Sequence, residues 1–543
     1  MNAQLLNATP GSVFTLAALL FAASSPRPAH AFVIVDSGQE DAYDVGDVID
    51  PPAEGEAYYG QDRHYFSHPP RLQDNGDGTV SDLTTGLMWQ QDPGDKMTYD
   101  EAVAAVASFD LAGHTDWRLP TIKELYSLMR FDGEDPSGYE GNDTSGLVPF
   151  IDDDVFVFNY GDTDQGERII DAQYLSSTQY VGDNAWGMVF GVNFADGRIK
   201  GYDSDPSPHQ PDGKDFFVIY VRGDAGYGEN DFVVNGDGTV TDDASGLEWM
   251  QVDSGYFGVG EAGDGALTWP EALDWAEDLE FAGHSDWRLP SAKELQSLVD
   301  YTRAPSETGS AAIDPSFQVT SITDEAGDAN FPFYWSGTTH ANWQGGGHNA
   351  AYIAFGEALG YVGGRWTDVH GAGAQRSDPK VGDPDDYPYG HGPQGDAIRI
   401  YNHVRLVRDG LAVTPVPDVK VNGADGSVLV PEGDPVTVTV SMEANDFDRA
   451  RADLWVIATA PSGPFSYVYP ANWVSGVERA VAMPLQSIGA MTLYDASLPV
   501  GSYELQMAID HDADGELDAT WLDTVDITIG NGVNAEHGDS AVR

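Results

Sequence analysis

Cysteine is absent from the 543-residue sequence. Without thiols the chain forms no disulfide, no thiolate zinc site and no iron–sulfur cluster, and it has no cysteine nucleophile. Small exported domains often depend on disulfides, but larger domains bury enough apolar surface to fold without them. Because the length exceeds what a single core supports, we expect several domains.

Basic residues are also scarce. Lys and Arg number 26 against 88 Asp and Glu, only 7 of the 26 are lysines, and the formal net charge is -62. A surface this negative repels phosphate backbones and anionic lipid, which argues against nucleic acid as a partner. Two explanations of the acidity stay open. Solubility in high salt, as in a halophilic source, is favoured over the binding of divalent cations.

Long apolar runs are missing except near the start. The run Val13–Ala23 is too short to span a bilayer, and Ala29-His30-Ala31 offers a small-residue cleavage site. This pattern predicts a signal peptide over residues 1–31, although Met1–Ser12 lacks the usual Lys or Arg. We expect an exported chain that begins near Phe32, is periplasmic, cell-surface or extracellular, and has no transmembrane segment in its mature part.

A nine-residue phrase occurs twice. WRLPTIKEL covers Trp117–Leu125, and WRLPSAKEL covers Trp287–Leu295, 170 positions later. The turn sequence NGDGT recurs in the same way at Asn75–Thr79 and Asn235–Thr239. A period of this length exceeds that of solenoid repeats, so it indicates duplication of a whole domain. The predicted units are 57–223 and 226–409, after an N-terminal extension at 32–56.

Each unit carries turn and helix-start signals. Asn-Gly and Asp-Gly accept positive φ, so NGDGT predicts a tight turn between strands. Thr98 and Glu101 form a capping-box pattern at the start of a predicted helix, Thr98–Asp110. Thr121 and Glu124 repeat the pattern after the extended Trp-Arg-Leu-Pro, so the repeated phrase predicts a strand-to-helix junction anchored to the core. The equivalent pairs in the second unit are Thr268 with Glu271 and Ser291 with Glu294.

The pattern changes after Asp409. A Pro-bearing linker covers 410–418, and apolar and polar residues then alternate in runs such as TVTVSM and DLWVIATA, separated by Gly and Pro turns. Period-two alternation predicts strands that bury one face. We expect an all-β immunoglobulin-like sandwich at 419–530 and a disordered tail at 531–543.

The order of motifs in each unit resembles the Lcl C-terminal domain family. These motifs are NGDGTV, GLMW or GLEW, GHTDWRLPTIKEL or GHSDWRLPSAKEL, a YWSGT-type strand and a terminal VRLVR. The helix junction also resembles the RLPTEAEW segment of formylglycine-generating-type domains, which have a C-type-lectin-like fold. The resemblance implies an α+β fold: two tandem C-type-lectin-like domains, followed by the sandwich. In the collagen-like adhesin that names the family, the domain is associated with sulfated glycans, but a chain at -62 has few residues for a basic patch.

One acidic loop has the spacing of metal ligands. Alternate carboxylates around Gly515 could converge their oxygens on a hard cation such as calcium. Position twelve of the loop is Trp521 instead of the bidentate Glu of an EF-hand, so a solvated hairpin turn stays open as the alternative. The candidate ligands are Asp510, Asp512, Asp514 and Asp518.

A long Gly/Pro/Asp-rich segment, His370–Asp396, precedes the last strand of the second unit. Loops of this length are often functional, and in lectin-like folds such loops commonly form the ligand face. Aromatic rings there would stack on sugar faces. The candidate contacts are Trp335, Trp343, Asp368, His370 and Arg376. A place in the core is the alternative for both tryptophans, more so for Trp335, and a histidine-bound transition metal is a weaker alternative for the segment.

Catalytic signatures do not accompany these candidates. The sequence has no G-x-S-x-G elbow and no H-E-x-x-H motif, and formylglycine-type oxidation needs reactive cysteines. We therefore expect a non-enzymatic binding or adhesion protein that recognises an extracellular glycan or surface protein through loops of its tandem domains. A structural assembly role without a small ligand and, less favoured, a hydrolase on the same scaffold stay open.

Overall fold

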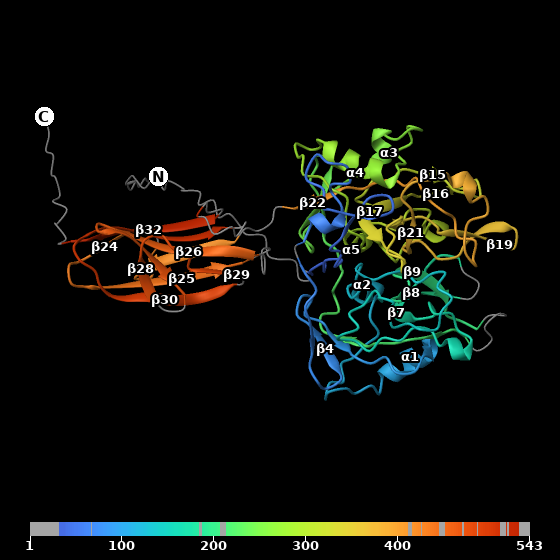
Figure 1. Ribbon diagram of the computed structural model, residues 1–543, viewed down its shortest axis with the longest axis horizontal. Coiled ribbons are helices and arrows are strands. Elements are labelled where there is room, and N and C mark those ends of the chain that lie inside the picture. Colours follow the sequence, from blue (N-terminus) through green and yellow to red (C-terminus); the bar gives the residue numbers. More distant parts are fainter. Residues whose placement is uncertain are drawn as a thin grey trace, which may run out of the picture.

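A computed structural model describes residues 32–530 with short gaps, and within these limits the fold is mostly β-sheet with few helices (Figure 1). In that described part, no helix is long and apolar enough to cross a bilayer. The predicted signal peptide and tail lie outside it. The positions left undescribed are 1–31, 67, 184–186, 207–212, 411–414, 425, 445–450, 470–471, 486, 511–516, 518–520 and 531–543.

Each repeat opens with a small antiparallel sheet built on the predicted turn. In the first repeat, Gly76 and Gly78 have φ of 73° and 88°, which confirms the positive-φ turn. A strand from the end of the repeat closes the sheet, in the order β11-β5-β4-β3, and the second repeat has the equivalent order β12-β13-β14-β22. The strands are β3 (Leu72–Asp74), β4 (Thr79–Asp82), β5 (Met88–Gln90), β11 (Val221–Arg222), β12 (Phe232–Val234), β13 (Thr239–Asp242), β14 (Leu247–Met250) and β22 (Val407–Asp409).

The helices start where the capping signals place them. All four predicted capping boxes are present, with the side chain of each Thr or Ser bonded at the helix start and the Glu bonded back to the cap. The first helix ends at Val106, earlier than predicted, because Ser108 and Phe109 bond three residues back instead of four. The helices are α1 (Tyr99–Val106), α2 (Ile122–Tyr126), α3 (Ser254–Phe257), α4 (Trp269–Asp278), α5 (Ala292–Ser297) and α6 (Pro305–Thr308).

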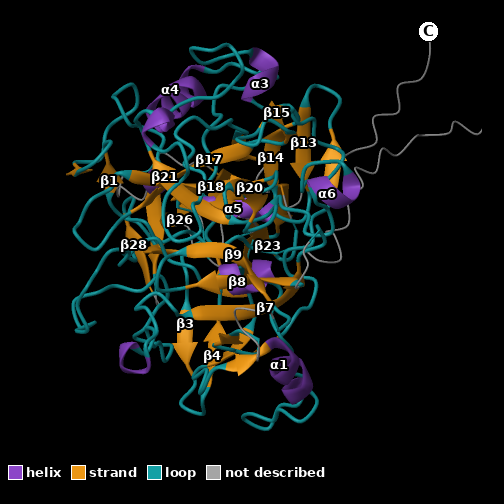
Figure 2. Cartoon of the chain, turned by 90° about the vertical axis from the view of Figure 1, so that its right-hand side faces the viewer, coloured by secondary structure: helices purple, strands orange, loops and turns teal. Residues whose placement is uncertain are grey.

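The two repeats share one six-stranded sheet (Figure 2). Its order is β17-β18-β21-β9-β8-β7, so three strands come from each repeat. The central contact is antiparallel and pairs Gln375 with Ile199. The strands are β7 (Gln173–Gln179), β8 (Met188–Asn193), β9 (Arg198–Asp203), β17 (Phe333–His340), β18 (Asn349–Ala354) and β21 (Gln375–Pro379).

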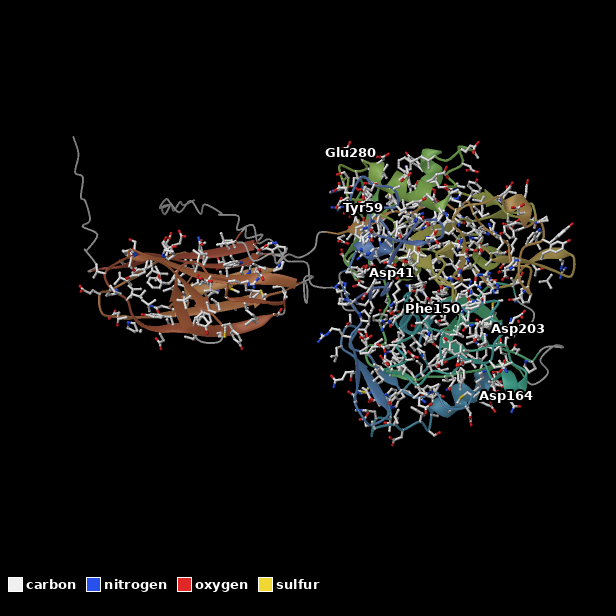
Figure 3. The ribbon with its side chains drawn as sticks, viewed as in Figure 1. Asp41, Tyr59, Phe150, Asp164, Asp203 and Glu280 are labelled. Atoms are coloured by element: carbon white, nitrogen blue, oxygen red, sulfur yellow. The ribbon has the colours of Figure 1, made fainter. Side chains whose placement is uncertain are left out.

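One hydrophobic core runs through both repeats, and each repeat also has a smaller core of its own. The shared core joins the buried faces of α2 and α5 to one side of the shared sheet, so Leu125 and Leu295 of the repeated phrase are both fully buried in it. Phe150 of the first repeat stacks on His340 of the second at 5.0 Å. Phe150 lies deep between the repeats, whereas the exposed Asp164 and Glu280 lie at the periphery (Figure 3). The anchoring role predicted for the phrase is confirmed.

The segment before the first repeat packs across both units. Phe32 is buried in the shared core, and its backbone N donates to the Ala244 carbonyl. The Gln39 side chain donates to the Thr339 carbonyl and accepts from the Thr339 N–H, as a neighbouring strand would. The segment contains β1 (Ala42–Tyr43) and β2 (Val48–Ile49), and the 3₁₀ turn Asp62–His64 follows at the start of the first repeat.

The remaining short elements lie in the connections of the repeats. Two strand pairs, β15 with β16 and β19 with β20, form small hairpins of the second repeat. The elements are β6 (Met97–Thr98), β10 (Asp215–Phe216), β15 (Ile322–Thr323), β16 (Ala329–Asn330), β19 (Leu359–Val362), β20 (Arg365–Asp368) and the 3₁₀ turns Thr163–Gln165 and Pro384–Asp386.

The C-terminal part is all β and has a core of its own. Two sheets, β23-β25-β30 and β24-β32-β31-β26-β27-β28 with β29 on β26, enclose this core. The period-two runs of the sequence form its long strands. The strands are β23 (Val416–Val421), β24 (Gly426–Val430), β25 (Pro435–Glu443), β26 (Arg451–Ala460), β27 (Gly463–Val468), β28 (Asn472–Ser475), β29 (Val481–Pro484), β30 (Ile488–Ser497), β31 (Gly501–Asp510) and β32 (Trp521–Ile529).

Candidate functional site

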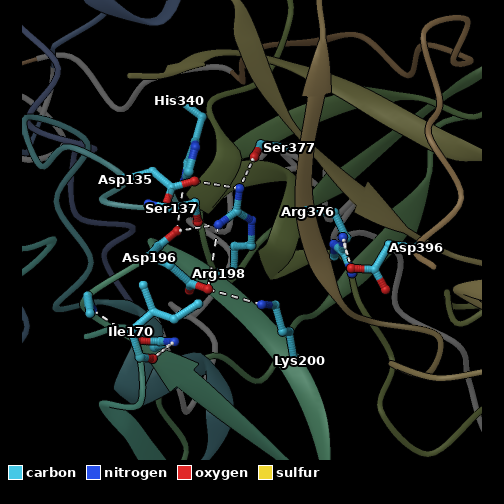
Figure 4. Close-up of polar contacts among 12 residues, drawn as sticks. Asp135, Ser137, Ile170, Asp196, Arg198, Lys200, His340, Arg376, Ser377 and Asp396 are labelled. Carbon is cyan, nitrogen blue, oxygen red and sulfur yellow. Dashed lines mark hydrogen bonds and ion pairs between the residues drawn. The ribbon is translucent and has the colours of Figure 1, made fainter. Parts of the chain in front are cut away.

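Charged side chains gather where β9 of the first repeat meets β21 of the second (Figure 4). We call this cluster the seam. Alternate residues of a strand share one face, which places the charges of β9 on the side of the sheet away from the shared core. The seam consists of Asp135, Asp196, Arg198, Lys200, His340, His370, Arg376, Ser377 and Asp396.

Arg198 is the centre of the seam. Its Nη2 donates to Asp135 Oδ2 at 2.8 Å and to Ser377 Oγ at 2.9 Å, so one guanidinium connects both repeats. Lys200 Nζ donates to Asp196 Oδ2 at 3.0 Å. Burial alone would raise the pKa of the Asp135 carboxyl, but Arg198, His340 and the Ser137 hydrogen bond together outweigh it and hold that pKa below its ordinary value. The seam carboxylate beside Arg198 is therefore ionised and paired.

Asp396 joins two of the predicted site residues. Its Oδ1 lies 2.9 Å from His370 Nε2, and its Oδ2 accepts from Arg376 Nη2 at 2.7 Å. Burial, reinforced by Arg376, lowers the pKa of His370 to about 4, so the ring is neutral at pH 7. In a hydrolytic triad the Asp bonds Nδ1 of the His, whereas Asp396 bonds Nε2, so this pair does not have the triad arrangement. In the part of the chain that is described, the other ring nitrogen, Nδ1, is buried and has no hydrogen-bond partner.

Other polar atoms at the seam are also buried without a partner among the described residues. They are Asp196 Oδ1, His340 Nδ1 and Arg376 Nε, and Tyr202 Oη of the adjoining strand β9 is in the same state. Burial raises the pKa of Tyr202 well above its ordinary value, and Asp196 raises it further. Such atoms are uncommon in native proteins, where water or a ligand usually satisfies them.

Two of the five predicted contacts, His370 and Arg376, belong to the seam, and Asp368 lies two residues before His370. Asp368 holds this region in place, because it accepts from Tyr180 Oη at 2.7 Å and from the Gly371 N–H at 2.9 Å. His370 and Arg376 are buried and bonded to Asp396, so they do not present their side chains at a loop surface as predicted. Their role is to hold loop and strand together.

The two tryptophans differ. Trp335 is fully buried, and its Nε1 donates to the Leu267 carbonyl at 2.9 Å. The prediction of a ligand contact is therefore wrong for Trp335, because a strand residue facing the core cannot stack on a sugar. Trp343 is half-buried, and its backbone N donates to the Asp135 carbonyl of the first repeat. Its ring meets Tyr139 edge to face, with centroids 5.1 Å apart.

A surface pocket of about 290 Å³ lies beside this aromatic pair. One wall follows Asp135 along the chain, and the Ser137 N–H donates to Asp135 Oδ1 at 2.9 Å, which links the wall to the seam. The opposite wall belongs to the segment before β7. The lining residues are Pro136, Ser137, Gly138, Tyr139, Glu140, Gly141, Asn142, Thr163, Arg168, Ile169 and Ile170.

The predicted calcium loop falls mostly outside the described residues. Asp510 ends β31 and is buried opposite Asp453 of β26. Asp512, Asp514 and Asp518 lie outside the described part of the chain. Within the described ranges, no group of three or more His, Cys, Asp or Glu side chains is arranged to hold a metal ion. The calcium prediction therefore stays a prediction.

Sequence reasoning missed the central residues of the site. Asp135 and Tyr139 stand in DPSGYEGN, a Gly/Pro-rich stretch with an aromatic residue, and its composition was a usable signal. Arg198 and Lys200 alternate within RIKGYD, a period-two charge pattern in a strand. Their pairing with the second repeat was not visible, because it joins residues more than 170 positions apart.

Comparison with known proteins bears mainly on the repeats. The sequence matches no curated protein. Among 18 similar chains of known structure is a putative beta-galactosidase from Bacteroides fragilis, with 12% identity and a TM-score of 0.13. That match covers 33% of this chain and 30% of the other, and a TM-score this low carries no argument.

The family comparison is specific. A model of the Lcl C-terminal domain matches the chain twice, at residues 78–222 and 238–370. The first range covers most of the first repeat and the second covers the second repeat as far as His370, before β21, and together they cover slightly more than half of the chain. The chain therefore belongs to the Lcl C-terminal domain family and carries two copies of the domain in tandem.

Proposed function

We propose that this chain is an exported, non-enzymatic binding protein that recognises an extracellular glycan at the pocket beside the seam. The observation that carries the proposal is the contact of Tyr139 with Trp343. Two aromatic rings, one from each repeat, meet next to a pocket of about 290 Å³ with a mixed polar and apolar lining. Aromatic faces with nearby polar groups are the physical basis of sugar recognition.

The surroundings of the pocket support a preorganised site. Asp135 fixes one wall through Ser137 and fixes Trp343 through its own carbonyl. Arg198 in turn holds Asp135 against the second repeat. Rigid walls reduce the entropy lost on binding, which favours affinity. We extend the proposal to the fold and assign C-type-lectin-like repeats and an immunoglobulin-like sandwich.

A structural assembly role is the second candidate. The shared sheet and shared core favour it, because they make the tandem repeats one rigid body that could space other surface components. This role needs no small ligand, so the two candidates differ in what they require of the pocket.

The test is direct binding by the mature chain. A glycan array would identify a ligand, and titration calorimetry would then compare Tyr139→Ala and Trp343→Ala with the unchanged protein. We expect each variant to lose at least about tenfold in affinity, since a stacked aromatic contributes over ~1 kcal/mol beyond its buried area. Tyr469→Ala is the matched control, because Tyr469 is a 59% exposed tyrosine of the sandwich. Absence of glycan binding, or equal binding by all variants, would favour the assembly role.

A further inference from the structure

The positive charges around the pocket are already paired. Arg168 lines the pocket, and its Nη2 donates to Asp171 Oδ1 at 2.7 Å while its backbone N donates to Oδ2 of the same carboxylate at 2.8 Å. Lys96 Nζ lies 2.6 Å from Glu167 Oε2 and also donates to the Asp171 carbonyl. Both cations next to this wall therefore have carboxylate partners of their own.

The same holds behind the pocket. Arg198 is paired with Asp135, Lys200 with Asp196, and the more distant Arg376 with Asp396. These groups are largely buried, so releasing one for an incoming anion would leave a carboxylate buried without its partner. Breaking a buried pair in this way is strongly unfavourable.

Negative charge remains at the mouth of the pocket. Glu140 is an exposed lining residue, and Asp164 is exposed on the segment that forms the opposite wall. With the neighbouring cations paired, the local field is negative, as it is for the whole chain at -62. A sulfated or carboxylated ligand would meet repulsion there. The uncharged polar side chains of the lining, Ser137, Asn142 and Thr163, offer hydrogen bonds without charge.

We infer that the ligand of this pocket is an uncharged, polyhydroxylated glycan, bound by its terminal unit against Tyr139, the aromatic residue of the lining. The inference rests on the proposed function and narrows it to one chemical class. A volume of about 290 Å³ lies just below the roughly 300–1,000 Å³ range of small-molecule sites, which suits a chain end of one or two rings. Neutral hydroxyls exchange hydrogen bonds with such a lining at no electrostatic cost.

The experiment compares three classes of oligosaccharide on the mature full-length chain. The probes are neutral hexasaccharides (cello-, malto- and galacto-series), a sulfated heparin hexasaccharide and a cationic glucosamine hexamer. Each is titrated at about 50 mM and about 500 mM NaCl, because added salt screens charge interactions and leaves neutral contacts nearly unchanged. We expect a neutral probe to bind with a Kd that changes less than about twofold with salt.

Two variants locate that binding. Tyr139→Ala should weaken binding of the neutral probe at least about tenfold, and Tyr469→Ala should leave it unchanged. Preferential binding of the sulfated or cationic probe, with affinity that falls steeply in salt, would overturn the inference and leave glycan recognition standing. Neutral binding that survives Tyr139→Ala would overturn it too, because the ligand would then lie outside this pocket. If none of the probes binds, the proposed function fails together with the inference.

Discussion

Lys123 and Lys293 join the two repeats by equivalent hydrogen bonds, each from the lysine of one repeat to a serine carbonyl of the other. Lys123 Nζ donates to the Ser297 carbonyl at 2.7 Å, and Lys293 Nζ donates to the Ser127 carbonyl at 2.9 Å. The lysines stand 170 positions apart in the repeated phrase, and so do the serines that follow them. Between them lies a cavity of about 20 Å³, the space of one water. Each repeat thus donates one buried lysine hydrogen bond to the other.

Replacing Lys123 should destabilise the tandem unit. Lys123→Met removes the donor to three acceptors, the carbonyls of Gly228 and Ser297 and the side chain of Asn230. Leaving acceptors without a donor in a mostly buried site should lower the free energy of unfolding by about 2–4 kcal/mol. Urea unfolding followed by tryptophan fluorescence measures it. Lys420→Met, which removes a partly exposed pair with Asp418 in the sandwich, is the control and should cost under about 1 kcal/mol.

Stability of the repeats should rise with pH above neutrality. Burial lowers the pKa of Lys293 to about 7 from an ordinary 10.5. Between these values the unfolded chain binds a proton that the folded chain lacks, so raising the pH favours the folded state. Relative to Lys293→Met, the unchanged protein should gain up to about 1.4 kcal/mol per pH unit between pH 7 and about pH 10. If the free energy of unfolding changed with pH in the same way for both proteins between pH 7 and about pH 10, the lowered pKa of Lys293 would be contradicted.

Two tyrosine hydroxyls should respond differently to removal. The Tyr202 hydroxyl is buried without a partner among the described residues, so Tyr202→Phe should leave stability unchanged or raise it by about 1 kcal/mol. The Tyr352 hydroxyl lies 2.9 Å from Asp378 Oδ2, so Tyr352→Phe should cost about 1–2 kcal/mol. Denaturant midpoints of the two variants test the pair. An equal cost at both positions would show that Tyr202 has a partner, such as bound water.

The repeats should fold only together, and the sandwich should fold alone. A fragment covering 32–409 keeps the shared sheet and core, whereas 57–223 loses half of both. The sandwich has a separate core, so 416–530 needs neither repeat. Circular dichroism and dispersed amide NMR signals should therefore appear for 32–409 and for 416–530. A folded, cooperative 57–223 fragment would show that the shared sheet is dispensable.

Calcium should stabilise the sandwich if the acidic loop binds it. We expect calorimetry of the mature chain at high salt to show one transition at higher temperature with calcium than with chelator. The double variant Asp512→Ala/Asp514→Ala should abolish that difference, because it removes two of four predicted carboxylate ligands. If the transition temperature did not change with calcium, the loop would be a solvated turn. The acidity of the chain would then be explained by solubility in high salt.

Local structure followed from the sequence and the assembly did not. The pairs Thr121/Glu124 and Ser291/Glu294 predicted helix starts because capping depends on residues three apart. The apolar Leu125 and Leu295 were predicted to anchor these helices to the core, which also depends only on nearby residues, and both are buried. The pairing of Ile199 with Gln375 leaves no such signal, because a single bridge between distant strands imposes no periodicity. Trp335 was misassigned since composition alone does not say which face of a strand it occupies.

The contact between the two repeats has twofold symmetry. β9 and β21 are the third strands of their halves of the sheet, and they meet antiparallel, so each presents the same edge to the other. The reciprocal bonds of Lys123 and Lys293 obey the same twofold relation. In such an isologous contact, each partner uses the same surface, so two partners leave no such surface free to bind a third. Duplication of this domain therefore gives a pair in which both of these sheet edges are occupied. A third copy in the chain would find no free edge equivalent to that of β9 or β21, and would need a fourth copy to form the same contact.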